Sequence, residues 1–402
     1  MKTTIAIPTY WGRAEGYLLN PVDVVYDHPT PLNRNGTLAR CLASFAILDR
    51  ADFEVVVIAS PTHPELAAET ENKVAEIIRP YSDQLNVSLI TPARVAGLRG
   101  AMGRELGQET AALIDSYGYS NVRNLCLIAG HAKDAENIIL IDDDELIEYP
   151  EFLDRALDHM DSAEAGRGSK AKAGWYMRPD GGYMGPPTRD PWWQDWQGAE
   201  AMNAGFEAVI GREGRFARTP FAFGGNMVIS RDVFTEIAFD PKIPRGEDID
   251  YVFNAMMGGF EFIMDKELWI RHRPPVSQVP DWMGFRINAL RFMYARQKLL
   301  TQTVAGLTGV ISVTDLDPYP GRFLRGDLDE KIRRTCRLLG QRYAAIGDTA
   351  AYQEAMLTPD MTERLRQKEQ NACAEYLALR ERWQNLMKHL RHNPATTEIL
   401  YR

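Results

Sequence analysis

The stretch Ile138-Ile139-Leu140-Ile141-Asp142-Asp143-Asp144-Glu145 says most about the fold of this chain of 402 residues. Its aliphatic half predicts a buried strand over 137–141, and its acidic half falls at the carboxyl end of that strand. Ligands of open α/β sheets gather at this end of the strands. The acids could form a solvated turn. Carboxylates at positions i and i+2, here Asp142 and Asp144, can also project to one side and bind Mg²⁺ or Mn²⁺ beside phosphate oxygens.

The residues before this stretch alternate strand and helix patterns, which is typical of a parallel sheet covered by helices. Strands are expected at 4–7, ending at Pro8, at 53–58 and at 85–90, and helices at 37–45, 65–78 and 103–117. Gly, Pro and Trp predict long irregular segments over 170–223. Residues from 282 onward are expected to be helical, with a break at 315–326 and one long final helix over 361–390.

The composition excludes several classes of protein. With 46 Lys and Arg against 55 Asp and Glu, the formal net charge is -9, which disfavours a partner nucleic acid. The cysteines are scattered without a CxxC pair, so neither a zinc ribbon nor a disulfide framework is expected. No run of about 18 apolar residues suggests a transmembrane segment. The first residues lack the cleavage site of a signal peptide, and we expect a cytoplasmic protein.

A second acidic cluster, Arg245-Gly246-Glu247-Asp248-Ile249-Asp250-Tyr251, opens a helical pattern that runs to residue 257. The helix macrodipole favours acids in the first turn, which accounts for some of them. Three acids within four residues exceed that requirement. A carboxylate held at the start of a helix is well placed to act as a general base towards a hydroxyl nucleophile.

A histidine flanked by arginines follows at the end of an expected strand that begins near residue 260. A single histidine is more often structural than a ligand. Here the acidic pair upstream lacks a third ligand, and Arg271 and Arg273 are suited to phosphate, so we interpret His272 as a candidate metal ligand.

In this order, the three features resemble the GT-A glycosyltransferases, most closely the family-2-like group that uses nucleotide-diphosphate sugars. The resemblance covers roughly residues 1–275. It rests on Ile7-Pro8-Thr9-Tyr10, a helix at Thr37-Leu38-Ala39-Arg40-Cys41-Leu42, a DxD motif at Asp142-Asp143-Asp144, Phe223-Gly224-Gly225-Asn226-Met227, an ED motif at Glu247-Asp248, and His272.

The resemblance implies an α/β fold of GT-A type, with a Rossmann-like, mostly parallel central sheet flanked by helices and a helical C-terminal extension. We expect residues 1–145 to form the half that binds the nucleotide sugar and 146–280 the half that binds the acceptor and carries the catalytic base. Residues 281–402 would form the extension. We expect the extension to pack on the catalytic domain and its last long helix to form a possible homo-oligomer interface.

The resemblance also assigns roles to residues. The base and donor would be bound by Pro8, Thr9, Tyr10, Asp142, Asp143, Gly224, Gly225 and Asn226. A divalent cation, Mn²⁺ or Mg²⁺, would be bound by Asp144 and His272, with Asp142 near it. Asp248 matches the base of inverting members, and Glu247 is its neighbour. The strand at 53–58 continues as Ala59-Ser60-Pro61, without the acid that grips the nucleotide in many relatives, so the choice between UDP and GDP stays open.

The tryptophans Trp192, Trp193 and Trp196 lie between these motifs in sequence. They could stack on the sugar rings of an acceptor, or they could pack a long loop against the domain. The sequence supports the two interpretations equally.

The implied reaction is hexosyl transfer to a hydroxyl of a small molecule or glycan, with inversion. A retaining enzyme with the same metal site is the alternative, and a non-catalytic nucleotide-sugar-binding or scaffold protein is an alternative of another class. Retention of Asp142, Asp144, Asp248 and His272 disfavours the latter. A sugar-phosphate nucleotidyltransferase is disfavoured because no Gly-rich phosphate loop follows the first strand.

Overall fold

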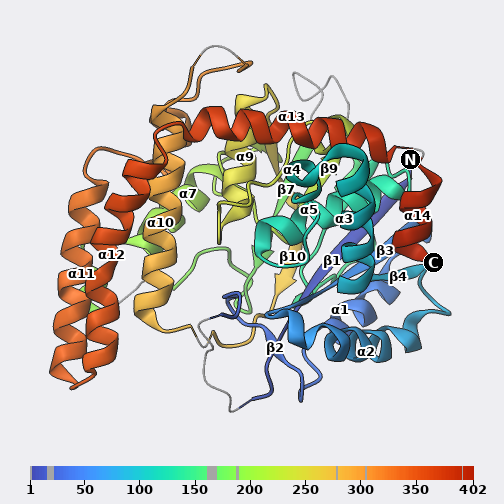
Figure 1. Ribbon diagram of the computed structural model, residues 1–402, viewed down its shortest axis with the longest axis horizontal. Helices are drawn as coiled ribbons and strands as arrows, with labels where there is room; N and C mark the ends of the chain where they lie inside the picture. Colours follow the sequence, from blue (N-terminus) through green and yellow to red (C-terminus); the bar gives the residue numbers. More distant parts are fainter. Residues whose placement is uncertain are drawn as a thin grey trace.

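The computed structural model describes residues 2–15, 22–160, 170–186, 190–277, 279–303, 306–391 and 393–402. Its strands form one sheet in the order β4-β3-β1-β5-β9-β7-β10-β6, with β2 beside β1 and β8 beside β10 (Figure 1). The strands are β1 Thr3–Gly12, β2 Thr30–Pro31, β3 Phe53–Pro61, β4 Val87–Ile90, β5 Asn137–Leu140, β6 Glu145–Leu146, β7 Ala171–Met177, β8 Phe216–Arg218, β9 Met227–Ser230 and β10 Phe262–His272.

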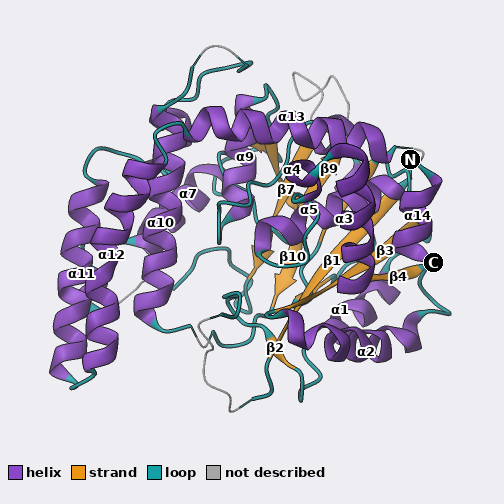
Figure 2. Cartoon of the chain, viewed as in Figure 1, coloured by secondary structure: helices purple, strands orange, loops and turns teal. Residues whose placement is uncertain are grey.

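Helices cover this sheet and extend from one end of it (Figure 2). They are α1 Leu38–Ser44, α2 Ala67–Ile78, α3 Pro92–Leu106, α4 Gln108–Ala111, α5 Tyr119–Ala132, α6 Phe152–Leu157, α7 Gly198–Val209, α8 Arg231–Phe234, α9 Glu247–Met257, α10 Asp281–Leu300, α11 Leu328–Ala345, α12 Thr349–Lys368, α13 Ala372–Leu390 and α14 Pro394–Tyr401. Short 3-10 helices lie at Phe45–Ile47, Pro64–Leu66, Arg79–Tyr81, Pro191–Trp193, Val313–Leu316 and Gly321–Phe323.

The sheet is mixed but mostly parallel. β4, β3, β1 and β5 run parallel to one another, β9 is antiparallel between β5 and β7, and β7 pairs in parallel with β10. The expected fold class, an α/β fold with a mostly parallel sheet and a helical C-terminal region, is confirmed. In the described part of the chain, no helix has the length and apolar character needed to cross a membrane.

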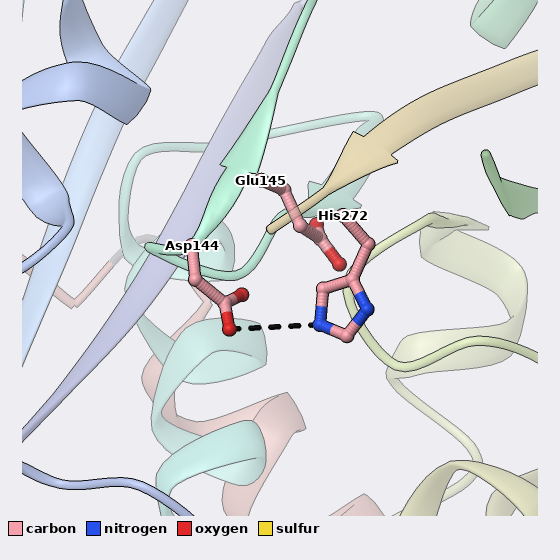
Figure 3. A group of neighbouring side chains, drawn as sticks. All are labelled: Asp144, Glu145 and His272. Carbon is pink, nitrogen blue, oxygen red and sulfur yellow. Dashed lines mark ion pairs between the residues drawn. The ribbon is translucent and has the colours of Figure 1, made fainter. Parts of the chain in front are cut away.

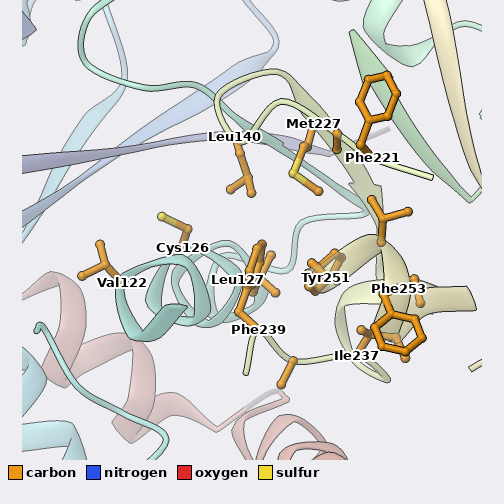
Figure 4. Close-up of a cluster of buried hydrophobic side chains, with 14 of the residues drawn as sticks. Val122, Cys126, Leu127, Leu140, Phe221, Met227, Ile237, Phe239, Tyr251 and Phe253 are labelled. Carbon is orange, nitrogen blue, oxygen red and sulfur yellow. The ribbon is translucent and has the colours of Figure 1, made fainter. Parts of the chain in front are cut away.

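Successive residues of the central strands point to opposite faces of the sheet, and both faces are buried. In β3, Val55 and Val57 belong to one apolar cluster, with α1 and α6, while Val56 and Ile58 belong to the other. The second cluster packs α5 and α9 against the sheet (Figure 4). Burial on both faces explains why the central strands read as continuous apolar runs, as parallel strands do.

The first strand does not end at Pro8, as expected, but runs on to Gly12. The carbonyl of Ala6 accepts a hydrogen bond from the amide of Ile141, so Ala6 faces β5. Pro8, two residues on, faces the same way, but the pairing with β5 stops at Ala6. Pro8 pairs with β3 on its other side only. The amide proton that proline lacks would point to the side where β5 no longer pairs, so its absence costs no hydrogen bond between strands.

The helix expected over 103–117 is not one continuous helix. The end of α3, up to Leu106, and the short α4 lie within this segment, and α5 begins after it. Gly107 and Gly118 have φ angles of +87° and +86°, which end one helix and precede the next. These backbone angles suit glycine because it has no Cβ, and they interrupt a helical pattern that looks continuous in the sequence.

The segment 170–223 is less irregular than expected because it contains β7 and α7. The sequence pattern did not indicate β7 because the strand contains a charged residue, Lys172, which is 1% exposed. Its ammonium group lies 3.4 Å from a carboxylate oxygen of Asp265 in β10 and donates to the carbonyl of Arg155. A charged residue at a core position breaks the apolar pattern of a buried strand.

The final helix is likewise two helices, α12 and α13, separated by residues 369–371. Glu369 in this break is buried and pairs with Lys242. Figure 1 shows α13 running back over the sheet domain to α14, beside α3. Trp383 of α13 donates to the carbonyl of Phe234, and Arg94 of α3 donates to the carbonyl of Leu400. The C-terminal helices therefore pack on the sheet domain of the same chain.

A buried charged cluster fixes α10 to α9. The ammonium group of Lys298 lies 2.9 Å from Asp240 and 2.8 Å from Asp250, and it donates to the side chain of Asn254. Tyr294 also donates to Asp240. Burial alone would lower the pKa of Lys298, but the two carboxylates raise it, so the lysine stays charged.

Replacing Lys298 by Met is expected to lower the free energy of unfolding by about 3–5 kcal/mol, because it leaves two buried carboxylates without their cation. Chemical denaturation of the full chain measures this loss. The control is Arg366→Met, which breaks an exposed pair with Glu363 and should cost less than about 1 kcal/mol. Equal losses in the two variants would contradict the role of the cluster.

Candidate active site

A cavity of about 1360 Å³ opens at the carboxyl ends of β1 and β5 and extends to α10. Several sequence-predicted residues line it: Tyr10, Asp142, Asp143, Asp144, Gly224, Glu247, Asp248, His272, Trp192, Trp193 and Trp196. Four other sequence-predicted residues do not line the cavity: Pro8, Thr9, Gly225 and Asn226. Motifs that are far apart in the sequence thus meet at one cavity, as expected for the strand ends of an open sheet.

The three aspartates after β5 have different partners. Asp142 pairs with Arg123 at 2.8 Å. Asp143 accepts hydrogen bonds from the hydroxyl groups of Thr9 and Thr37. Asp144 alone faces the two histidines, His28 at 3.0 Å and His272 at 3.5 Å. Asp142 and Asp144 therefore have different neighbours, and the role of Asp142 near a cation stays a prediction.

Asp144, Glu145 and His272 form a group whose potential ligand atoms lie within 4.8 Å of one another (Figure 3). Glu145 is fully buried. One of its oxygens accepts the amide proton of Asp142 at 2.8 Å, and the carboxyl group also lies within hydrogen-bonding reach of the Tyr176 hydroxyl. A carboxylate buried beside other carboxylates is costly unless a cation balances the charge. Two carboxylates and an imidazole fit a divalent cation such as Mn²⁺.

The charge states of this group differ. Burial opposes ionisation of Asp144, but hydrogen bonds from His272 and His28 hold its pKa below the usual range. Burial raises the pKa of Glu145, and the charges of Asp142 and Asp144 add to the effect. Burial and the neighbouring Asp144 raise the pKa of Asp143 to about 7. The carboxyl groups of residues 142–145 lie close together, and they need a nearby positive charge if all are to be ionised.

Arg123 of α5 supplies part of that charge. Its guanidinium group is 3% exposed and lies between Asp142, at 2.8 Å, and Glu247, at 3.2 Å. One terminal nitrogen, Nη1, has no hydrogen-bond partner among the described residues. Burial still raises the pKa of Glu247 in spite of Arg123. Arg123 joins the acidic end of β5 to the start of α9.

Asp248, in the first turn of α9, presents its carboxylate to the cavity. One oxygen accepts the amide proton of Gly224 at 3.0 Å, and the other accepts that of Ile249 at 2.8 Å. Burial raises its pKa, while these hydrogen bonds act in the opposite direction. The carboxylate is thus fixed in orientation and more basic than a solvated aspartate.

The two glycines beside Asp248 allow a close approach of backbone and side chains. A Cβ on Gly224 would lie 2.7 Å from Arg123, and one on Gly225 would lie 2.2 Å from both oxygens of Glu145. Asn226 has a different place: its buried amide donates to the carbonyls of Trp175 and Leu268, where it ties β7 to β10.

Aromatic residues line both ends of the cavity. At the β1 end, the ring centroid of Tyr10 lies 4.4 Å from Tyr26 and 4.9 Å from Tyr119. At the other end, Trp196 is 1% exposed and lies 5.0 Å from the ring of Phe285 in α10. Trp192 is also buried, and Trp193 is half-buried. The tryptophans therefore both pack the loop onto α10 and contribute to the cavity wall.

Sequence reasoning missed Arg123, Glu145 and His28. Glu145 directly follows the DxD motif, so its acidic side chain was a usable signal. His28 lies in a segment rich in Pro and Asn without periodicity. Arg123 lies within a helix that was not expected at all.

Comparison with solved structures finds 50 matching chains, among them three of low identity to this chain. A mannosyltransferase from Pyrobaculum calidifontis in complex with GDP-Man and Mn²⁺ is 14% identical, with 94% of this chain and 85% of that chain covered and a TM-score of 0.47. A mycobacterial protein is 14% identical, with 73% of this chain and 72% of that chain covered and a TM-score of 0.39. Mouse xyloside xylosyltransferase 1 in its apo form is 14% identical, with 57% of this chain and 67% of that chain covered and a TM-score of 0.29.

No curated protein matches the chain. The profile of the family described as "Glycosyltransferase like family 2" matches residues 30–295. This match spans more than half of the chain and contains the acidic turn, the two glycines, the start of α9 and His272. It confirms the resemblance drawn from the motifs: the chain belongs to the glycosyltransferase-like family 2.

Proposed function

We propose that this glycosyltransferase uses a divalent cation and transfers a sugar from a nucleoside diphosphate sugar to an acceptor hydroxyl, with inversion and with Asp248 as the base. The observation that carries the proposal is that Asp144 and His272 line the same cavity as the carboxylate of Asp248, with Glu145 buried beside them.

Asp144, Glu145 and His272 would hold the cation, which when bound supplies positive charge to the oxygens of the diphosphate. Arg123 neutralises Asp142 and Glu247, and this allows an anionic donor to approach an acidic wall. The tyrosines around Tyr10 offer an aromatic wall for the nucleobase at the β1 end.

Asp248 would take the proton of the acceptor hydroxyl. The acceptor oxygen then forms a bond to the anomeric carbon, and the bond from that carbon to the diphosphate breaks, with its electron pair leaving on the nucleoside diphosphate. Attack from the face opposite the leaving group inverts the configuration. The amides of Gly224 and Ile249 keep the carboxylate oriented for this proton transfer.

Asp248→Asn is expected to lower kcat about 100- to 10,000-fold, because the amide cannot accept the proton. Nucleotide release from UDP-, GDP- and dTDP-sugars with Mn²⁺ measures it, and nuclear magnetic resonance of the product gives its anomeric configuration. Asp154→Asn, an exposed residue that pairs with Arg50 and does not line the cavity, is the matched control and should retain activity within about 3-fold.

Equal turnover by wild type and Asp248→Asn would refute the base. A product of retained configuration would favour the retaining alternative. Nucleotide-sugar binding without turnover by any donor and acceptor would favour a binding protein.

The proposed cation site predicts that Asp143 and Asp144, which are neighbours in the sequence, contribute differently to Mn²⁺ binding. Asp144→Asn should weaken Mn²⁺ binding at least about 10-fold, because it removes a ligand. Asp143→Asn should leave it nearly unchanged, since Asp143 faces Thr9 and Thr37. Calorimetric titration of the full chain with Mn²⁺ and UDP or GDP checks this. Equal affinity in the two variants would rule out the assigned group.

The rate should also fall in acid. Burial raises the pKa of Asp248, so the carboxylate takes up a proton at a higher pH than the ordinary value of about 3.9. The ionised base is the active form; kcat/KM should therefore fall as the pH drops through this raised pKa and level off above it. A rate that is flat down to pH 4 would contradict this assignment.

A further inference from the structure

Arg291 of α10 is a positive charge in the cavity wall without an acidic partner. The family-like motifs do not include it. Gly284, Asn288 and Arg291 lie at positions i, i+4 and i+7 of α10 and all line the cavity, so one face of this helix forms its wall. Among the described residues, no carboxylate forms an ion pair or a hydrogen bond with Arg291.

The guanidinium group is nevertheless held in a fixed orientation by neutral groups. Its Nε donates to the side-chain oxygen of Asn288 at 2.9 Å, and Nη2 donates to the hydroxyl oxygen of Tyr319 at 3.2 Å. The ring of Phe292 lies beneath it, 4.3 Å from the guanidinium carbon to the centroid. The hydrogen-bond partners of this half-buried guanidinium are neutral, so it keeps charge and donors that an anionic ligand could use.

Arg291 also lies beside the start of α9. A Cβ on Gly246 would come within 1.6 Å of its Nη1, so this nitrogen occupies the space above a glycine two residues before Asp248. The positive charge of Arg291 acts on Asp248, where it opposes the effect of burial on the pKa. The guanidinium and the proposed base therefore face the same part of the cavity.

Two of the other arginines that line the cavity, which are Arg40, Arg123, Arg178, Arg245 and Arg273, form ion pairs with acids. Arg123 pairs with Asp142 and Glu247, and Arg245 pairs with Asp27 at 2.9 Å. Arg273 follows His272, and the side chain of Arg40 donates to its carbonyl, so both belong to the end where the diphosphate would lie. Arg291 comes from α10, the first helix of the C-terminal region.

We propose that Arg291, oriented by Asn288 and Tyr319, binds an anionic group of the acceptor, which makes the acceptor class a hydroxyl compound that carries a carboxylate or a phosphate. This inference rests on the proposed function, because Asp248 marks where the acceptor hydroxyl lies. The planar guanidinium binds either anion through two parallel hydrogen bonds. The C-terminal helical region would thus select the acceptor.

Binding without turnover tests the proposal first. The full chain, saturated with Mn²⁺ and UDP or GDP, is titrated calorimetrically with pairs of compounds that differ in charge: glucuronate against glucose, gluconate against sorbitol, and glucose 6-phosphate against glucose. At least one charged member should bind about 10- to 100-fold more tightly than its neutral partner. The pairs also separate a carboxylate from a phosphate.

Arg291→Met should abolish this preference, and Arg291→Lys should retain part of it, since it keeps the charge but loses the planar fork. Arg296→Met is the matched control: it lies on the same helix, pairs with Asp329 and does not line the cavity. Thermal unfolding of each variant distinguishes a local effect from misfolding. With an active donor, the loss should appear in the KM of the charged acceptor and not in the KM of the donor.

Three results would overturn the proposal: no preference for any charged compound, a preference that survives Arg291→Met, or a loss of UDP or GDP affinity in Arg291→Met, which would place Arg291 at the donor. Failure of wild type to bind either nucleotide would instead refute the proposed function.

Discussion

The guanidinium group of Arg123 connects the two halves of the candidate site. It lies between the acidic end of β5 and the first turn of α9, in ion pairs with Asp142 and Glu247. Removing it would leave two carboxyl groups close together and shielded from water, which is strongly unfavourable. Asp142 is two residues from Asp144, and Glu247 adjoins Asp248. Arg123 therefore helps to set the relative placement of the proposed cation group and the proposed base.

The C-terminal helices add a second constraint on the same helix. Lys298 of α10 forms an ion pair with Asp250 of α9, two residues after Asp248. Nη1 of Arg291, also in α10, occupies the space beside Gly246, two residues before Asp248. α9 is therefore fixed at its start by Arg123 and along its length by α10. The helical region is attached to the catalytic machinery through these contacts, which its charged and apolar pattern in the sequence does not reveal.

The sequence predicted those parts of the molecule that follow from local pattern. The apolar run before Asp142 and the acids that open α9 are contiguous in the chain, and both are where they were expected. What failed depended on tertiary context: Lys172 conceals a strand because its partner, Asp265, is far away in sequence, and Gly107 and Gly118 interrupt helices through backbone angles that composition does not show. Arg123 and His28 join the site only when the chain folds.

We propose that a cation held by Asp144, Glu145 and His272 brings a nucleoside diphosphate to the cavity that Asp248 faces. Anomalous X-ray scattering from crystals grown with Mn²⁺ and UDP or GDP locates this cation. We expect a manganese peak between Asp144 and His272, in contact with the diphosphate. A diphosphate bound in the cavity with no manganese there, or with manganese at Asp143, would contradict it.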